Sequence, residues 1–368
     1  MATKLAFDRV LFTVVVLLLG VGLVMVYSAS VAQVRGDSQV LAEAVPVNPF
    51  LVKQTLAAGL GLVLMLVAMH VDYRQLARPT VVYACLAVVV ALLVLVLFSG
   101  TINGSRRWFL LGLFSFQPSE LAKVGLVLYL SYQISRKEED VDQPRLLVPC
   151  AVVSGLLAGL VLVQPDLGTA VLLVAVAVLL LILAGIPLRW VALGSAVLLP
   201  VFLYLIRAEP YRWRRLTAFL NPELDPTGAG YQANQSLIAV GSGGLWGRGP
   251  GESVQKLHFL PHPHSDFIFA IVAEELGLVG AVAVLALFVI LVWRGLRAGL
   301  HAPDTFGRFV GWGLTGLLGI QALVNVSVAL GLLPTKGLPL PFLSYGGSSL
   351  VVTLTACGLL LNISQHGG

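Results

Sequence analysis

Six ionisable side chains lie within or beside the long apolar segments of this sequence, and they are the residues best placed to do chemistry. A charged group in an apolar environment is costly unless it is paired or faces a water-filled cavity. Each is therefore expected to be part of a buried pair or part of a functional site. The six residues are Glu120, Lys123, Asp166, Asp266, Glu274 and Glu275.

Asp266 stands where a long polar segment meets an apolar run, in the sequence His264–Phe269. This position is typical of a helix N-terminus at a membrane surface, where Ser265 or Asp266 is suited to capping the helix. A carboxylate there is equally suited to act as a general base toward a hydroxyl group. The residues alone leave both roles open.

Glu274 and Glu275 follow Asp266 on the same expected helix. At about 100° per residue, Glu274 is rotated by about 80° from Asp266 and is able to line the same cavity, whereas Glu275 points nearly the opposite way. We therefore expect Glu275 to pair with another helix.

Glu120 and Lys123 are three residues apart, so they share one face of a helix and can form an ion pair. Pairing offsets much of the cost of burying the two charges. The spacing favours a structural or cavity-lining pair over direct participation in chemistry.

Two clusters of arginine and aromatic residues flank apolar runs, at Arg106–Trp108 and Tyr211–Arg215. Interfacial Arg, Trp and Tyr commonly anchor membrane helices at headgroup level. The planar guanidinium group also suits phosphate and pyrophosphate. These clusters slightly favour an anionic substrate.

Three other segments carry weaker signals. Gly241–Gly249 lacks the Lys-Ser/Thr pair of a P-loop and the third glycine of a dinucleotide fingerprint, so we expect close backbone packing there. The run Ser344–Ser349 favours tight helix packing. His258, His262 and His264 lack the helical spacing of a zinc site.

The composition sets the class of protein. Of 368 residues, 58% are hydrophobic and 11% are charged, against about 45–50% and about 25% in soluble domains. These values exclude a water-soluble enzyme, a disordered chain and a nucleic-acid-binding module. The three cysteines lie in apolar runs and are expected to be core residues. We therefore expect an all-α polytopic membrane protein without a nucleic-acid partner.

A bilayer core about 30 Å thick requires about 20 apolar residues per helical span. We expect ten transmembrane helices in a single integral-membrane domain covering residues 1–368. Basic residues in the short loops favour cytoplasmic N- and C-termini (N-in/C-in). Residues 207–265 then form a large extracytoplasmic loop between helices 7 and 8, folded onto the membrane surface. The predicted spans are 10–29, 49–70, 78–98, 117–135, 146–164, 168–186, 188–206, 266–293, 307–331 and 344–363.

Six ordered motifs resemble the SEDS family of bacteria over nearly the whole chain. Val26–Ser30 and Pro334–Gly337 are most similar to the cell-division branch of that family, with the elongation and sporulation branches as alternatives. Ser265 stands where the family usually has threonine, and it keeps the hydroxyl group. The motifs are Gly104–Trp108, Phe116–Lys123, Gln164–Thr169, Asn221–Pro226 with Gly230–Gln232 and Gln235–Ser236, His264–Phe269 with Glu274–Gly277, and Pro339–Pro341 with Ser344–Ser348.

The resemblance implies a peptidoglycan glycosyltransferase that polymerises lipid II into glycan strands at the outer face of the bacterial cytoplasmic (inner) membrane, at the division septum. Undecaprenyl pyrophosphate is then the leaving group. It further implies a divalent cation, Mg²⁺ or Mn²⁺, and a partner that is an FtsI-like class B penicillin-binding transpeptidase, with other division proteins and membrane lipids around it. A lipid II flippase and a scaffold that recruits the transpeptidase remain alternatives.

By the same resemblance, Asp266 matches the catalytic aspartate and is the expected general base. The arginines and Lys123 form the set from which pyrophosphate contacts are drawn, and Trp108 is placed to pack on a sugar or an isoprenoid. The sequence identifies no metal ligands. The candidate substrate-binding residues are Arg106, Arg107, Trp108, Glu120, Lys123, Arg212, Arg214, Arg215, Gln235, Ser236, Lys256, Glu274, Ser344, Tyr345 and Ser348.

Overall fold

The computed structural model describes residues 7–37, 48–101, 105–112, 114–137, 143–221, 228–257, 260 and 264–367. Within these ranges the chain is mainly helical, as the composition predicts. Its elements are α1 (Arg9–Asp37), α2 (Pro49–His70), the 3₁₀ helix η2 (Tyr73–Ala77), α3 (Pro79–Leu95), the 3₁₀ helix η3 (Val96–Phe98), β1 (Phe109–Leu111), β2 (Phe114–Phe116), α4 (Pro118–Arg136), α5 (Pro144–Val163), α6 (Leu167–Leu183), α7 (Leu188–Ala208), α8 (Pro210–Leu220), α9 (Ala229–Ser242), α10 (Ile268–Leu300), α11 (Thr305–Ala329) and α12 (Gly347–His366).

Each predicted apolar run coincides with a helix, and local signals set several of the helix starts. Asn48 accepts hydrogen bonds from the backbone of Phe50 and Leu51 at the start of α2, and Asp166 caps α6 through Thr169. These contacts satisfy backbone N–H groups that have no partner inside the helix.

Eight helices in the described part of the chain are long and apolar enough to cross a membrane: α1, α2, α3 with η3, α5, α7, α10, α11 and α12. The apolar helix α6 has only 17 residues. Helix α4 has 19 residues and carries the buried charges Glu120 and Lys123.

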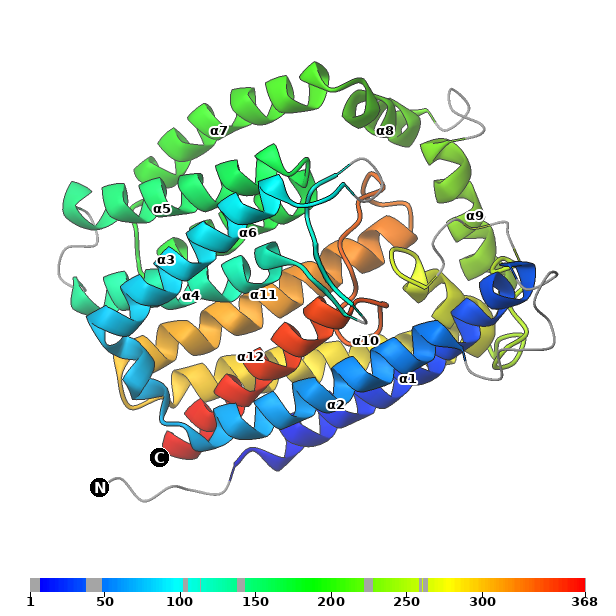
Figure 1. Cartoon of the computed structure of the whole chain (residues 1–368), viewed down its shortest axis with the longest axis horizontal. Helices are drawn as coiled ribbons and strands as arrows, with labels where there is room; N and C mark the ends of the chain where they lie inside the picture. Colours follow the sequence, from blue (N-terminus) through cyan, green and yellow to red (C-terminus); the bar gives the residue numbers. More distant parts are fainter. Residues whose placement is uncertain are drawn as a thin grey trace.

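The long helices lie side by side, and the start of α1 and the end of α12 lie at the same end of the bundle (Figure 1). Helix α2 packs along α12, and α10 packs along α11 and α1. Helix α4 is mostly buried, in contact with α3, α11, α5 and α6. Helix α7 lies along the outside of the bundle (Figure 1). Only 6% of the residues in its apolar stretch are buried inside the protein.

The segment 207–265 carries regular structure at the opposite end of the bundle from the α12 C-terminus. It contains the end of α7 and the helices α8 and α9, which follow one another around that end (Figure 1). The tract between α9 and α10 then leads back to Asp266.

A short β-hairpin between α3 and α4 is an exception to the predicted all-helical fold. Phe109 pairs with Phe116 and Leu111 pairs with Phe114 in antiparallel register. The Ser348 hydroxyl of α12 donates a hydrogen bond to the Ser115 carbonyl oxygen (2.5 Å), which ties the hairpin to the bundle.

The end of the bundle that holds the α12 C-terminus is fixed by buried and half-buried polar contacts. Arg294 of α10 pairs with Asp8 before α1 at 2.6 Å. The Tyr73 hydroxyl of η2 donates a hydrogen bond to the Asp304 carboxylate before α11. These contacts join α10 to the residue before α1, and η2 to the residue before α11.

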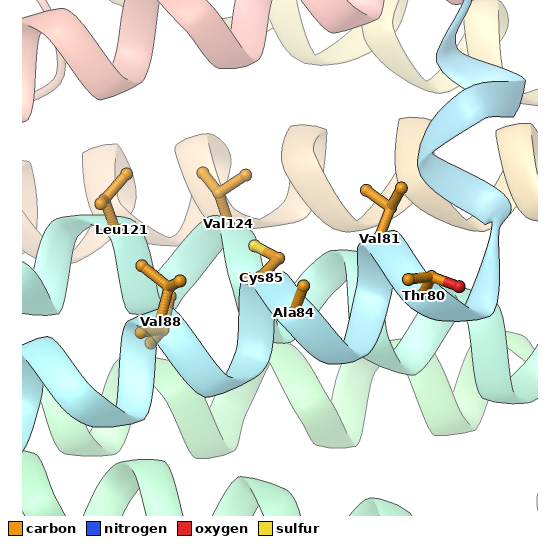
Figure 2. A pocket seen from close by; sticks show the side chains of 9 residues that line it. Thr80, Val81, Ala84, Cys85, Val88, Leu121 and Val124 are labelled. Carbon is orange, nitrogen blue, oxygen red and sulfur yellow. The ribbon is translucent and has the colours of Figure 1, made fainter.

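Two apolar grooves lie between the helices on the sides of the bundle. One, of about 460 Å³, lies between α3 and α4 and is lined by apolar side chains with Thr80 and Cys85 (Figure 2). The other, of about 450 Å³, lies between α5, α6 and α7. Neither is lined by a charged side chain, so the chemistry has to be sought at the end of the bundle.

The glycine-rich tract packs its backbone directly on a kink in α10, which confirms the interpretation from the sequence. The kink is at Gly277, with φ 66° and ψ −168°. Arg248 N donates to Glu274 O and Gly249 N donates to Glu275 O, both at 3.0 Å. A Cβ atom on Gly277 would lie 2.3 Å from the backbone nitrogen of Gly247, so a side chain is excluded there.

Gly277→Ala is therefore expected to destabilise the protein. The backbone conformation at this position is essentially restricted to glycine and costs other residues about 1–3 kcal/mol, and the new methyl group overlaps the Gly247 backbone. Thermal unfolding of the purified protein in detergent should show a clearly lowered melting temperature. Gly241→Ala is the control, because a Cβ atom on Gly241 meets no atom within 4 Å. Equal melting temperatures for the two variants would contradict the packing argument.

Candidate functional site

Asp266 lies immediately before α10, and its side chain is partly exposed. The N-cap position of α10 is Phe267, and no side-chain hydrogen bond caps this end. The structure therefore gives the cap position to neither Ser265 nor Asp266. A Cβ atom built on Gly337 would lie 3.4 Å from Asp266 Oδ2, so the loop between α11 and α12 approaches the carboxylate closely.

Two amides on α11 hold the segments around Asp266. The Nδ2 group of Asn325 donates to the Asp266 carbonyl oxygen (3.1 Å) and to the Leu338 carbonyl oxygen (2.8 Å). Gln321, one turn earlier, donates to the Pro339 carbonyl oxygen at 2.7 Å. Both amide side chains are buried, so these bonds fix the Asp266 backbone relative to the loop that carries Gly337.

Sequence reasoning missed Gln321 and Asn325. The signal that was available is their spacing of four residues, which places two amides on one face of an otherwise apolar helix. Buried amides require partners, so this face had to contact polar backbone.

Ser344 and Tyr345 hold the residues before Asp266 from the other side. The Ser344 hydroxyl donates to the Ser265 carbonyl oxygen (2.5 Å), and Tyr345 N donates to the His264 carbonyl oxygen (2.8 Å). The Tyr345 ring packs on Phe50 and His264, and burial raises the pKa of its phenol. Ser344 thus positions the backbone before Asp266, and the Tyr345 ring packs on His264 of the same segment.

The ion pair predicted between Glu120 and Lys123 is confirmed. Lys123 Nζ lies 2.7 Å from Glu120 Oε2, and both side chains are 4% exposed. Lys123 also donates to Gln321 Oε1 at 3.0 Å. A continuous set of buried polar contacts therefore runs from α4 through α11 to the loop beside Asp266. We call Glu120, Lys123, Gln321 and Asn325 the polar ladder.

Glu274 does not line the cavity of Asp266, contrary to the expectation from helix geometry. Its side chain is 0% exposed, and its carboxylate accepts hydrogen bonds from the Ser253 hydroxyl (2.5 Å) and from Val254 N (3.0 Å). The non-helical Gly277 and the folded tract after α9 enclose it, which a straight helix does not anticipate. Glu274 therefore stabilises that tract.

Lys256 is occupied in the same way. Its ammonium group donates to Ser28 Oγ (2.9 Å), Gly251 O (2.6 Å) and Glu275 Oε1 (2.8 Å). An ammonium group has three donors, and all three are occupied here. Substrate binding by Lys256 stays a prediction that these contacts do not support. Glu275 also accepts from Ser28 of α1 at 2.6 Å, which confirms that it pairs with another helix.

Arg106 and Arg107 anchor the hairpin through backbone carbonyl oxygens. Arg106 donates to Leu97 O at 3.0 Å, and Arg107 donates to Gln164 O (2.8 Å) and Pro165 O (2.5 Å). The Arg107 guanidinium also lies 6.0 Å from the Trp108 ring centroid. A guanidinium has five N–H donors, so each arginine keeps donors for an anion.

The arginines of α8 differ in their surroundings. Arg215 donates to the Thr335 carbonyl oxygen at 3.0 Å and so reaches the loop that carries Gly337. Arg212 donates to Leu205 O at 3.1 Å on α7, and Arg214 is exposed. Of the three, Arg215 is linked most directly to the segment beside Asp266.

The remaining candidates contact other segments or are partly exposed. The Ser236 hydroxyl donates to Ala329 O of α11 at 2.7 Å and is buried, and Ser348 holds the hairpin. Gln235 lies on α9 and is partly exposed. His258, His262 and residues 222–226 of the Asn221–Pro226 motif lie outside the described residues.

The described ranges contain no group of three or more His, Cys, Asp or Glu residues placed to hold a metal ion. The donor set around Asp266 consists mainly of amides and backbone carbonyl oxygens. These residues do not form a pre-built metal site.

The polar ladder predicts the effect of exchanging the two charges of the Glu120–Lys123 ion pair. Glu120→Gln and Lys123→Gln should each destabilise the protein by several kcal/mol, because each leaves a buried charge without its partner. The double exchange Glu120→Lys with Lys123→Glu should restore much of the melting temperature. It should not restore activity, because a carboxylate at position 123 cannot donate to Gln321 Oε1. Full recovery of activity in the exchange would show that the pair is structural only.

Known proteins are similar to this chain over nearly its whole length, as the motifs are. The chain is 44% identical to the "Probable peptidoglycan glycosyltransferase FtsW" of Trichlorobacter lovleyi, over 97% of this chain and 93% of that protein. It is 40% identical to the stage V sporulation protein E of Bacillus subtilis, over 98% of this chain and 97% of that protein.

Solved structures show the same fold. A structure described as the structural coordination of polymerization and crosslinking by a peptidoglycan synthase complex matches with a TM-score of 0.79 and 32% identity, covering 98% of both chains. The rod shape determining protein RodA of Thermus thermophilus matches with a TM-score of 0.71 and 32% identity, covering 99% of this chain and 98% of that one. The family model for the cell cycle proteins FtsW, RodA and SpoVE matches residues 8–367. The chain belongs to this FtsW/RodA/SpoVE family of cell cycle proteins, as its motifs indicated.

Proposed function

We propose that this membrane enzyme, a peptidoglycan glycosyltransferase of the FtsW type, polymerises lipid II into glycan strands with Asp266 as the general base. Relatives that share more than 40% identity over nearly the whole chain carry the name of this enzyme class. The observation that carries the mechanism is the partly exposed Asp266 carboxylate on a backbone fixed by Asn325 and Ser344.

The proposed reaction needs one base. A sugar 4-hydroxyl group of lipid II attacks the anomeric carbon of the growing chain, the new C–O bond forms, and the bond from that carbon to the pyrophosphate oxygen breaks. Asp266 takes the hydroxyl proton, and undecaprenyl pyrophosphate leaves as an anion. Because this leaving group needs no protonation, a second carboxylate is not required, unlike in glycoside hydrolysis. A well-placed base typically contributes about 10²–10⁴-fold in rate.

The remaining requirement is stabilisation of the pyrophosphate charge. Arg107 and Arg215 are bound to backbone carbonyl oxygens, which limits their freedom before substrate arrives. Fixed donors aimed at a developing charge act with little reorganisation. Trp108 beside Arg107 offers an aromatic surface for a sugar or an isoprenoid.

For the topology, we propose that α4 and α6 join the eight apolar helices as spans, giving ten. Helix α4 is shielded by its neighbours, so its ion pair does not meet lipid. Basic residues in short loops favour cytoplasmic N- and C-termini. Asp266, α8 and α9 then lie at the outer face of the cytoplasmic membrane, within one integral-membrane domain. Residues 207–265 are its extracytoplasmic loop.

As a partner we propose an FtsI-like class B penicillin-binding transpeptidase at the division septum, together with other division proteins. Support comes from the structural match to a peptidoglycan synthase complex that coordinates polymerization with crosslinking. A transpeptidase would supply the crosslinking activity that a glycosyltransferase lacks.

Asp266→Asn should abolish glycan synthesis from purified lipid II in detergent, with a rate loss of at least about 10²-fold, because an amide cannot accept the proton. Lipid II binding and the melting temperature should stay close to those of the unaltered protein. Glu252→Gln is the matched control, since Glu252 is an exposed carboxylate in the same extracytoplasmic segment.

Two outcomes contradict this proposal. Normal polymerisation by Asp266→Asn would remove Asp266 as the base. If the unaltered protein with its transpeptidase makes no polymer but moves lipid II across liposomes, it is a flippase and not a polymerase.

A divalent cation, Mg²⁺ or Mn²⁺, is proposed from the family resemblance alone. No step of the mechanism above depends on it, because the described residues do not form a metal site. Chelation with EDTA should lower polymerisation, and either ion should restore it when added back. Unchanged polymerisation after chelation would exclude the cation.

A further inference from the structure

Lys336 is a cation next to the Asp266 segment that has no anionic partner among the residues that the structure describes. It precedes Gly337, whose backbone approaches the Asp266 carboxylate. In the described part of the chain Lys336 forms no ion pair and no hydrogen bond, and its ammonium nitrogen lies 5.9 Å from the ring centroid of Phe202 on α7. Burial lowers the pKa of Lys336. In the sequence, this lysine belongs to the Pro334–Gly337 segment that is similar to the cell-division branch of the family.

Lys336 is partly exposed and so keeps part of its water, and its interaction with Phe202 supplies no opposite charge. A cation over an aromatic ring gains about 0.5–1 kcal/mol at exposed sites and about 2 kcal/mol when desolvated. Removing a charge from water costs several kcal/mol unless an opposite charge is close. An anionic ligand would supply that charge.

Thr335 and Arg215 provide two further donors beside Lys336. The Thr335 hydroxyl is buried and has no hydrogen-bond partner in the described ranges. Arg215 donates one guanidinium N–H group to the Thr335 carbonyl oxygen, so α8 is joined to this loop. An ammonium group, a guanidinium group and a hydroxyl group together suit a phosphate or a diphosphate.

The position of these residues selects a lipid-linked anion. They lie between the loop beside Asp266 and the outer helix α7, of which little is covered by protein. A soluble phosphate would not need contact with an apolar helix, whereas the diphosphate of a membrane-bound substrate lies at this boundary.

We propose that Lys336, Thr335 and Arg215 form the anion site for the diphosphate of the lipid-linked substrate, with Lys336 as its principal cation. The inference rests on the proposed glycosyltransferase function, which it extends by adding Lys336 and Thr335 to Arg215 as residues that bind the diphosphate. Phospholipid headgroups share the phosphate chemistry, so the experiment has to separate the two sources.

Binding is tested on the full chain in phosphatidylcholine nanodiscs, with three probes: undecaprenyl pyrophosphate, undecaprenyl phosphate and phosphatidylglycerol. Lys336→Gln should weaken undecaprenyl pyrophosphate binding by about tenfold or more, and undecaprenyl phosphate binding by less, since charge-assisted hydrogen bonds are lost. Lys336→Arg should retain most of the affinity. Phosphatidylglycerol binding should not change.

Lys53→Gln is the matched control, because Lys53 is an exposed lysine near the start of α2 and its loss changes the net charge equally. In polymerisation of lipid II, Lys336→Gln should raise KM more than it lowers kcat. Melting temperatures of both variants show whether they fold.

Unchanged undecaprenyl pyrophosphate binding by a folded Lys336→Gln variant overturns the site. An equal loss of phosphatidylglycerol and undecaprenyl pyrophosphate binding also overturns it, because the site then holds a phospholipid headgroup. If the unaltered protein binds undecaprenyl pyrophosphate through Lys336 yet makes no polymer, the glycosyltransferase function fails while the anion site stands.

Discussion

The structure depends on buried charges and amides that pair with one another inside the bundle. In the polar ladder, the Glu120–Lys123 ion pair of α4 continues through Gln321 and Asn325 of α11 to the backbone at Leu338, Pro339 and Asp266. Because these groups pair with one another, much of the free-energy cost of burying their charges and amides is offset. The same contacts fix the Asp266 backbone, which lies before α10 and outside any regular secondary structure.

The residues of α10 before the kink at Gly277 hold a different segment from the one that the polar ladder holds. Before Gly277, Glu274 and Glu275 bind the tract that follows α9, with Lys256 and Ser28 completing the cluster. The polar ladder, by contrast, holds the Asp266 backbone and the loop after α11. Residues that looked like substrate contacts in the sequence therefore belong to the support of the site.

Much of the fold could be predicted because bilayer thickness and helical geometry impose strong patterns on the sequence. Apolar runs located the long helices, the three-residue spacing of Glu120 and Lys123 gave their ion pair, and the missing P-loop residues identified the glycine tract as packing. Gln321 and Asn325 were missed because their contacts join segments distant in the sequence. Glu274 was misplaced because helical periodicity does not survive the positive φ of Gly277. The hairpin, with three residues per strand, is too short for periodicity to reveal.

Helix α7 has a consequence for how freely different parts of this sequence can vary. Lipid tails, unlike protein neighbours, impose no particular shape on the side chains that they touch. Because so little of α7 is covered by protein, most of its positions need only be apolar, and one aliphatic residue can replace another. Helix α4 is enclosed on nearly every side, so the volume and polarity of specific neighbours constrain its residues. Neutral drift should therefore accumulate along the outer helix and be nearly absent from the inner one.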